Sequence, residues 1–94
     1  MIKGYEYKGL LQGFFELPID NNTTLSIYDT EEGYEIEFIE NIDEPNEEIV
    51  DCMIYESQDW ETLDNLLKFA INNTYVKYYK NRLIEIIGGL QYEN

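Results

Sequence analysis

The spacing of apolar residues changes near residue 57, and this change limits what the chain can fold into. Before it, apolar and polar side chains largely alternate, most cleanly in "YEIEFIE" at residues 34–40. This period of two is typical of strands with one buried face. After it, apolar residues recur at helical spacing, at Trp60, Leu63, Leu67, Ala70 and Ile71. Strands followed by helices predict an α+β fold.

The alternating part predicts about four strands. The first spans residues 5–17, and its two glycines predict a bend or bulge near residues 9–13. The second and third strands, at 25–29 and 34–40, are joined by a short turn that contains a glycine. The fourth, "IVDCMIYE" at 49–56, is apolar enough to be a central strand.

The C-terminal part predicts one or two helices. Ser57 or Asp59 is expected to cap the first helix, and Asn72–Asn73 to end it. Residues 74–87 combine strand propensity with apolar residues at helical spacing. We favour a helix for this segment, and Gly88–Gly89 would end it.

The whole chain, residues 1–94, is short enough to form a single domain. Hydrophobic residues make up 44% of it, which is sufficient for a core. We predict an antiparallel meander of about four strands, followed by one or two C-terminal helices that pack on one face of the sheet.

The residues on which most enzymes rely are missing. The chain has no histidine and a single cysteine, so the usual nucleophile–base pairs and zinc sites are not available. Cys52 lies in the apolar stretch "VDCMIY", which predicts a buried and unreactive thiol. We expect no enzymatic activity, no catalytic residue, no cofactor and no metal. The acidic turn "DTEEGYEIE" lacks EF-hand spacing, so we expect a solvated turn there, although an irregular calcium site stays open.

Targeting signals are missing from the sequence as well. The chain shows neither a signal-peptide pattern nor an apolar run long enough to span a bilayer. Its single cysteine cannot form an internal disulfide, which is typical of proteins in a reducing compartment. We therefore expect a cytoplasmic protein of a bacterial host cell that has no membrane partner.

Negative charge is concentrated in one part of the chain. The net charge is −14, and residues 9–67 contain no lysine or arginine. One explanation is a surface that only keeps the protein in solution, but unopposed charge of one sign destabilises a compact fold. The other is a positively charged partner. Tyrosines and cations alternate in "YVKYYKNR", yet a protein this acidic would repel phosphates, so we expect no direct nucleic-acid binding.

The candidate contact residues follow the outward face of the predicted sheet. Glu35 and Glu37 would lie about 6.8 Å apart on one strand, close to two phosphate steps of about 3.4 Å each along DNA. Other acidic residues are expected to extend this row at both ends, with Tyr28 beside it as an anchor. The predicted partner-binding set is Tyr28, Asp29, Glu31, Glu32, Glu35, Glu37, Glu40, Asp43, Glu44, Glu47 and Glu48.

In its small size, its cation-free stretch at 9–67 and its acidic residues on a predicted sheet, the chain resembles the small acidic inhibitors of phages and mobile elements. This class includes anti-restriction proteins, uracil-DNA glycosylase inhibitors and anti-CRISPR proteins, some of which imitate DNA. The resemblance implies a protein that inhibits a basic nucleic-acid-binding protein or nuclease by presenting a DNA-like negative surface. It implies no particular fold and assigns no functional residue.

Two other functions fit the same sequence. An immunity protein or antitoxin that neutralises one basic toxin would use the same acidic surface. A structural or assembly protein would carry an acidic face that is merely solvated. In that case we expect a homodimer that forms through the tyrosine-rich C-terminal element.

Overall fold

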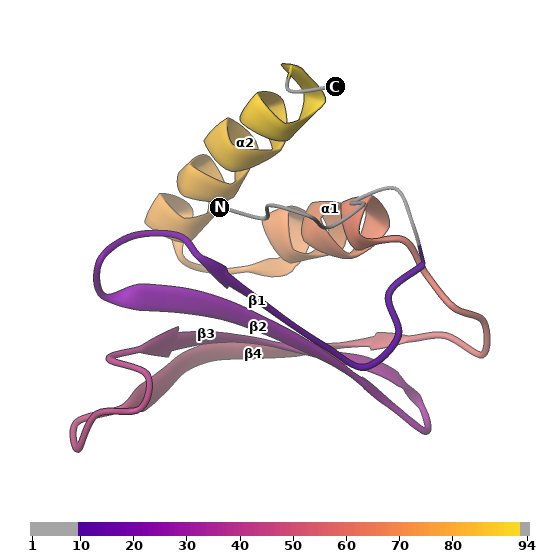
Figure 1. Ribbon diagram of the computed structural model, residues 1–94, viewed down its shortest axis with the longest axis horizontal. Helices are drawn as coiled ribbons and strands as arrows, with labels where there is room; N and C mark the ends of the chain where they lie inside the picture. Colours follow the sequence, from indigo (N-terminus) through magenta and orange to yellow (C-terminus); the bar gives the residue numbers. More distant parts are fainter. Residues whose placement is uncertain (1–9, 93–94) are drawn as a thin grey trace.

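The structure is a computed structural model that describes residues 10–92, and it consists of an antiparallel sheet with two helices on one face (Figure 1). The strands are β1 (Phe14–Pro18), β2 (Thr23–Thr30), β3 (Gly33–Glu40) and β4 (Glu48–Glu56). The helices are α1 (Leu63–Asn73) and α2 (Lys77–Tyr92). The strand order is β1-β2-β3-β4, so every strand pairs with its neighbour in the sequence. The predicted α+β meander with C-terminal helices is confirmed.

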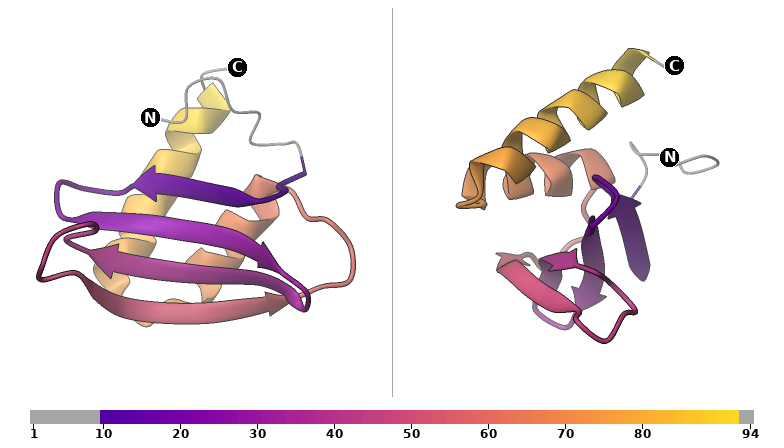
Figure 2. Two further views of the ribbon diagram at one scale, coloured as in Figure 1. Left: turned by 60° about the horizontal axis from the view of Figure 1, so that its bottom comes forward. Right: turned by 90° about the vertical axis from the view of Figure 1, so that its left-hand side faces the viewer.

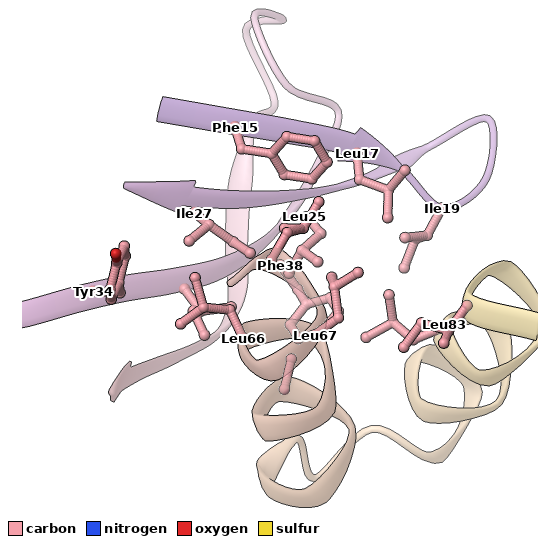
Figure 3. Packing of buried hydrophobic residues seen from close by; sticks show 14 of the residues in the cluster. Phe15, Leu17, Ile19, Leu25, Ile27, Tyr34, Phe38, Leu66, Leu67 and Leu83 are labelled. Carbon is pink, nitrogen blue, oxygen red and sulfur yellow. The ribbon is translucent and has the colours of Figure 1, made fainter. Parts of the chain in front are cut away.

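The core lies between the sheet and the helices, as the side chains in Figure 3 show. Alternate residues of each strand point into it, including Tyr34, Ile36 and Phe38 of β3, as the spacing predicted. The helices contribute buried residues at helical spacing, such as Leu67 of α1 and Leu83 of α2. Each strand therefore has one face toward the helices and one face away from them.

Hydrogen bonds from α2 fix the helix layer to one end of the sheet. The ring of Tyr79 stacks on that of Phe38, with 4.7 Å between the ring centroids, and its hydroxyl donates to the Glu40 carboxylate. The Arg82 guanidinium donates to the carbonyl of Ile19, which follows β1. Within the described part of the chain, neither helix combines the length and hydropathy that a bilayer crossing requires.

The first strand is shorter than the sequence predicted. It begins at Phe14, because Gly13 has a φ of +92° and turns the chain away from the sheet, in agreement with the predicted bend. Before the bend, Leu10 bridges to Thr62, and the Leu11 amide donates to the Glu61 carbonyl. The earlier part of the predicted strand, at 5–9, lies outside the described residues.

The first helix begins later than the sequence predicted. α1 starts at Leu63 because the Thr62 side chain caps it by accepting a hydrogen bond from the Asn65 amide. The predicted caps, Ser57 and Asp59, instead form a small turn before the helix. α1 ends at Asn73 as predicted.

Residues 74–87 proved to be largely helical, as favoured, since α2 covers Lys77–Tyr92. The predicted end at Gly88–Gly89 was wrong, because the helix continues through both glycines. A glycine weakens a helix interior by only about 1 kcal/mol relative to alanine and does not force it to end.

β4 is an edge strand, although its apolar sequence predicted a central one. It pairs only with β3, and its other edge is free of strands among the described residues. Val50, Met53 and Tyr55 pack against the core, whereas Ile49 and Ile54 point away from it and are exposed. The apolar run therefore combines a core-facing set with exposed residues on the opposite face.

Candidate partner-binding surface

Among the described residues, nothing covers the face of the sheet that turns away from the helices, and Figure 2 (left) shows the four strands in front of the helices. We call this surface the open face and define it by three rows of residues that are paired across all four strands. The first row is Phe14, Tyr28, Glu35 and Ile54, the second is Glu16, Ser26, Glu37 and Cys52, and the third is Pro18, Thr24, Ile39 and Ile49. Carboxylates and apolar side chains thus share one side of the sheet.

Three large apolar side chains stand out on the open face. Phe14 is 59%, Ile54 is 54% and Ile49 is 51% exposed, although all belong to strands. Phe14 and Ile54 lie at the two ends of one row, with Tyr28 and Glu35 between them. Exposed apolar residues that flank polar groups are characteristic of protein–protein contact surfaces.

Burial and neighbouring negative charge shift the pKa of two side chains on the open face. The Tyr28 hydroxyl donates to Glu35 at 2.6 Å, and this bond, with partial burial and the nearby charges, raises the pKa of Tyr28. Partial burial raises the pKa of Glu37, and repulsion from Glu35 and Glu47 adds to the increase. The ionised form of Glu37 is therefore disfavoured in the free protein, and a positive partner would stabilise it.

Cys52 is exposed on the open face, so the prediction of a buried thiol was wrong. The residue lies on the edge strand β4, paired with Glu37 on the open face. Partial burial and then the charges of Glu35, Glu37 and Asp51 raise the pKa of its thiol from 9.0. The thiol therefore stays protonated at neutral pH, which makes it a poor nucleophile.

Glu35, Glu37 and Cys52 also form a group of possible metal donors. One ligand atom from each residue lies within 4.8 Å of the others. Within residues 10–92 this is the one such group of three, and exposed acidic groups are common without an ion. The geometry alone gives no reason to place a metal here.

The predicted row of carboxylates is interrupted, because two of its members point toward the helix side. Asp29 accepts a hydrogen bond from the Gly13 amide at 2.8 Å. Glu40 accepts one from the Tyr79 hydroxyl, and burial together with this bond raises the pKa of Tyr79 to about 12. Both carboxylates hold the fold together, and they do not lie beside Glu35 and Glu37.

The acidic loop between β3 and β4 lies at the opposite end of the sheet from the β2–β3 turn. Asp43 and Glu44 are exposed there, and the Asp43 amide donates to the Glu47 carboxylate. Glu47 is near enough to Glu37 to raise its pKa, so it is the loop residue that approaches the open face. Glu48 is exposed and paired with Glu40, which places it off the open face.

The β2–β3 turn forms a cleft with the segment that follows β4. The cleft has a volume of about 980 Å³, and its wall includes the acidic residues Glu31, Glu32, Glu56 and Asp59 together with Trp60. A smaller hollow of about 310 Å³ joins Glu31 and Glu32 to Glu35 and Ile54 of the open face. Glu31 and Glu32 were predicted contact residues, whereas the sequence reasoning missed the other three.

Gly33 allows the two sides of this cleft to meet. Its φ is +138°, and a Cβ atom there would lie 2.1 Å from the Tyr55 carbonyl oxygen. Trp60 was assigned to the helix from its spacing, but it precedes the helix and is 48% exposed in the cleft wall. The sequence signal that would have found it is Thr62, because a threonine cap excludes Trp60 from the helix.

Positive charge lies in a different layer of the molecule. The described cations are Lys68 on α1 and Lys77, Lys80 and Arg82 on α2. Two of them are paired locally, since Lys68 contacts Asp64 and Arg82 contacts Glu85. Among residues 10–92, neither the open face nor the cleft includes a lysine or arginine.

Comparison with protein-family models, with curated proteins and with solved structures gave no match to this chain. The interpretation of the surface therefore depends on the geometry and electrostatics described above.

Proposed function

We propose that this protein is a non-enzymatic acidic binding protein whose open face contacts a positively charged protein. The observation that carries the proposal is the separation of charge between the two layers. The sheet layer presents Glu16, Glu35 and Glu37, while all described cations lie on the helices. Such a charge distribution accelerates association with a basic partner and penalises acidic ones.

The apolar residues of the open face favour a protein partner over a free cation. Phe14 and Ile54 are exposed at the ends of a row that also contains Glu35. A protein surface would desolvate these side chains, and buried apolar and aromatic contacts supply most of the affinity at interfaces. Charge then selects and orients the partner.

The proposed class of partner is a nucleic-acid-binding protein or nuclease, which the protein inhibits by occupying its basic groove. Glu35 and Glu37 face the same side of β3, and carboxylate oxygens of the two approach within 4.8 Å. This is closer than the about 6.8 Å expected from the strand repeat, so the two residues present one compact negative site to the groove. Tyr28, Phe14 and Ile54 lie beside them, so the groove is expected to carry apolar residues next to its basic ones. In this proposal the chain acts as an inhibitor of the kind carried by phages or mobile elements, possible targets of which include CRISPR nucleases.

A merely solvated acidic face explains the surface less well. Solvation alone does not require a carboxylate such as Glu37, whose pKa is raised by partial burial and then by repulsion from Glu35 and Glu47. It also does not require large apolar side chains of the strands, such as Phe14 and Ile54, to remain exposed to solvent. Both features cost stability in the free protein, and a bound partner would offset both.

An affinity-capture experiment tests the proposal. Tagged protein is incubated with nuclease-treated bacterial lysate at low and moderate salt, beside Glu35→Lys/Glu37→Lys. The control, Glu44→Lys/Glu48→Lys, changes the net charge equally but alters exposed residues away from the open face. We expect a basic nucleic-acid-binding protein, identified by mass spectrometry, to be retained by the parent and the control and lost by the open-face variant.

The captured protein is then purified, and its nucleic-acid binding is measured with and without the inhibitor. Inhibition by the parent, and none by Glu35→Lys/Glu37→Lys, is the expected result. Circular dichroism of all variants shows whether they are folded. Equal capture by both variants, or capture without inhibition, would contradict the proposal.

A further inference from the structure

We propose that the cleft at the β2–β3 turn holds an arginine side chain of the basic partner. This inference depends on the proposed function, because it names the group that the partner inserts beside the open face. The cleft is continuous with that face through the hollow lined by Glu35 and Ile54. A partner seated on the open face would therefore bring its adjoining side chains to the cleft.

The carboxylates of the cleft are available to a ligand. The carboxylates of Asp29, Glu35 and Glu40 accept hydrogen bonds within the protein. In contrast, within residues 10–92 no hydrogen bond or ion pair involves the carboxylates of the cleft acids Glu31, Glu32, Glu56 and Asp59. Their four negative charges come from two segments that are far apart in the sequence and line one concave surface.

The exposed aromatic part of the cleft wall is Trp60, and hydrogen bonds hold the segment that carries it. Trp60 exposes about half of its surface, and the buried Tyr34 lies behind the cleft wall. The Tyr34 hydroxyl donates to the Leu11 carbonyl and accepts from the Glu61 amide, which fixes the segment that carries Trp60. The Ser57 hydroxyl bonds both the amide and the carbonyl of Asp59. Such a wall is ordered before a ligand arrives, which lowers the entropic cost of binding.

Carboxylates beside an exposed indole fit a guanidinium group better than other cations. Arginine presents a planar fork of donors that pairs bidentately with carboxylates, and the same plane stacks on aromatic rings. Lysine satisfies the charges but stacks less well. A bare metal ion would use only the oxygens and would leave the aromatic wall and most of the 980 Å³ without a contact.

Trp60 is the only tryptophan, so its fluorescence reports directly on the cleft. The probe is a hexa-arginine peptide, with hexalysine and CaCl₂ as separate titrations. We expect hexa-arginine to change the fluorescence saturably and to bind more tightly than hexalysine. The cleft variant Glu32→Gln/Asp59→Asn should lower the affinity about tenfold, because charge-assisted hydrogen bonds are lost. The control Glu44→Gln/Glu48→Gln removes the same charge elsewhere and should change it less than about twofold.

Calorimetry with Trp60→Leu, which keeps an apolar side chain but removes the ring, is expected to abolish the preference for arginine over lysine. Equal weakening by the cleft variant and its control would overturn the cleft assignment, and so would a fluorescence response to CaCl₂ without one to the peptide. If in addition Glu35→Lys/Glu37→Lys still abolishes capture of the basic partner, the proposed function survives that failure. If no peptide binds and no basic partner is captured, both proposals fail.

Discussion

At the scale of single residues, the ionised Glu37 side chain lowers the stability of the free protein. Partial burial and the neighbouring carboxylates raise its pKa, so the folded state holds this proton more tightly than the unfolded state does. The ionised side chain is therefore unfavourable in the fold. Its penalty is present at neutral pH and is relieved as the pH falls toward the raised pKa.

Because the pKa of Glu37 is raised in the folded state, the effect of replacing this residue on stability should depend on pH. Replacing Glu37 by glutamine should raise the denaturation midpoint at neutral pH, and the gain over the parent should shrink as the pH is lowered toward the folded pKa. Urea titrations at several pH values measure the difference. Asp20 is the control: burial acts to raise its pKa, but hydrogen bonds from Asn22, Tyr78 and Thr23 outweigh it, so the pKa is lowered. Asp20→Asn should therefore destabilise at neutral pH, and a gain there instead would contradict the assignment.

Gly33 carries the second prediction at this scale. Gly33→Ala should destabilise the fold by about 2 kcal/mol or more, because a Cβ would meet the Tyr55 carbonyl at 2.1 Å and φ is positive. Gly13→Ala is the matched substitution, since Gly13 also has a positive φ but no atom lies within 4 Å of its Cβ position. Thermal melts of both variants should show the larger loss for Gly33. Equal losses would mean that backbone strain alone, and not the close approach at the cleft, sets the cost.

At the scale of elements, hydrogen bonds cover part of the free edge of β4. The Tyr75 hydroxyl donates to the Val50 carbonyl at 2.9 Å, and the Asp51 carboxylate accepts from the Cys52 amide. Thr74 donates to the same carboxylate and holds it in place. An edge strand whose groups are occupied in this way cannot easily pair with a second sheet. The exposed Tyr75 thus has a role within its own chain, and self-association through it is not needed to explain it.

We expect Asp51→Ala/Tyr75→Phe to increase self-association, because the variant frees backbone groups on the edge of β4. Light scattering after size-exclusion chromatography, at matched protein concentration, measures the change. Tyr78→Phe is the control, since this hydroxyl bonds Asp20 and not the edge. If the double variant is no more associated than the parent, the edge is protected in some other way.

The elements were predictable from the sequence where one local pattern decided the outcome. Alternation placed Tyr34 in the core and put Glu35 and Glu37 on the outward face. The start of α1 was not found, because the apolar spacing of Trp60 continued the helical pattern while Thr62 ended the loop. The edge position of β4 was missed because an apolar run is common to central strands and to edge strands that expose apolar residues on one face.

The candidate surface was predictable only in part, for a related reason. Alternation along one strand gives the open-face residues of β3, but strand pairing adds Phe14 and Ile54 to them. The cleft depends on contacts between segments far apart in sequence. Trp60 and the β2–β3 turn line the same cleft, and the Glu61 amide next to Trp60 donates a hydrogen bond to the Tyr34 hydroxyl of β3. No periodicity in the sequence encodes that contact.

At the scale of the whole molecule, the net charge of −14 makes stability and binding respond to salt in opposite directions. Repulsion among the carboxylates of the sheet layer destabilises the free protein, and dissolved ions screen it. The same ions weaken attraction to a basic partner. Screening becomes strong once the Debye length falls to about 10 Å, near 0.1 M salt.

We therefore expect the melting temperature to rise between about 10 mM and about 300 mM NaCl, while affinity for the captured basic partner falls over the same range. Differential scanning fluorimetry and calorimetry measure the two quantities on one preparation. Glu35→Gln/Glu37→Gln should flatten both dependences, because it removes charge from the surface where repulsion and attraction coincide. Glu44→Gln/Glu48→Gln should weaken the salt dependence of the melting temperature and leave the salt dependence of the affinity unchanged. If salt raised the melting temperature but left the affinity unchanged, apolar contacts such as Phe14 and Ile54 would dominate the interface, and the charge would serve only to keep the free protein dispersed.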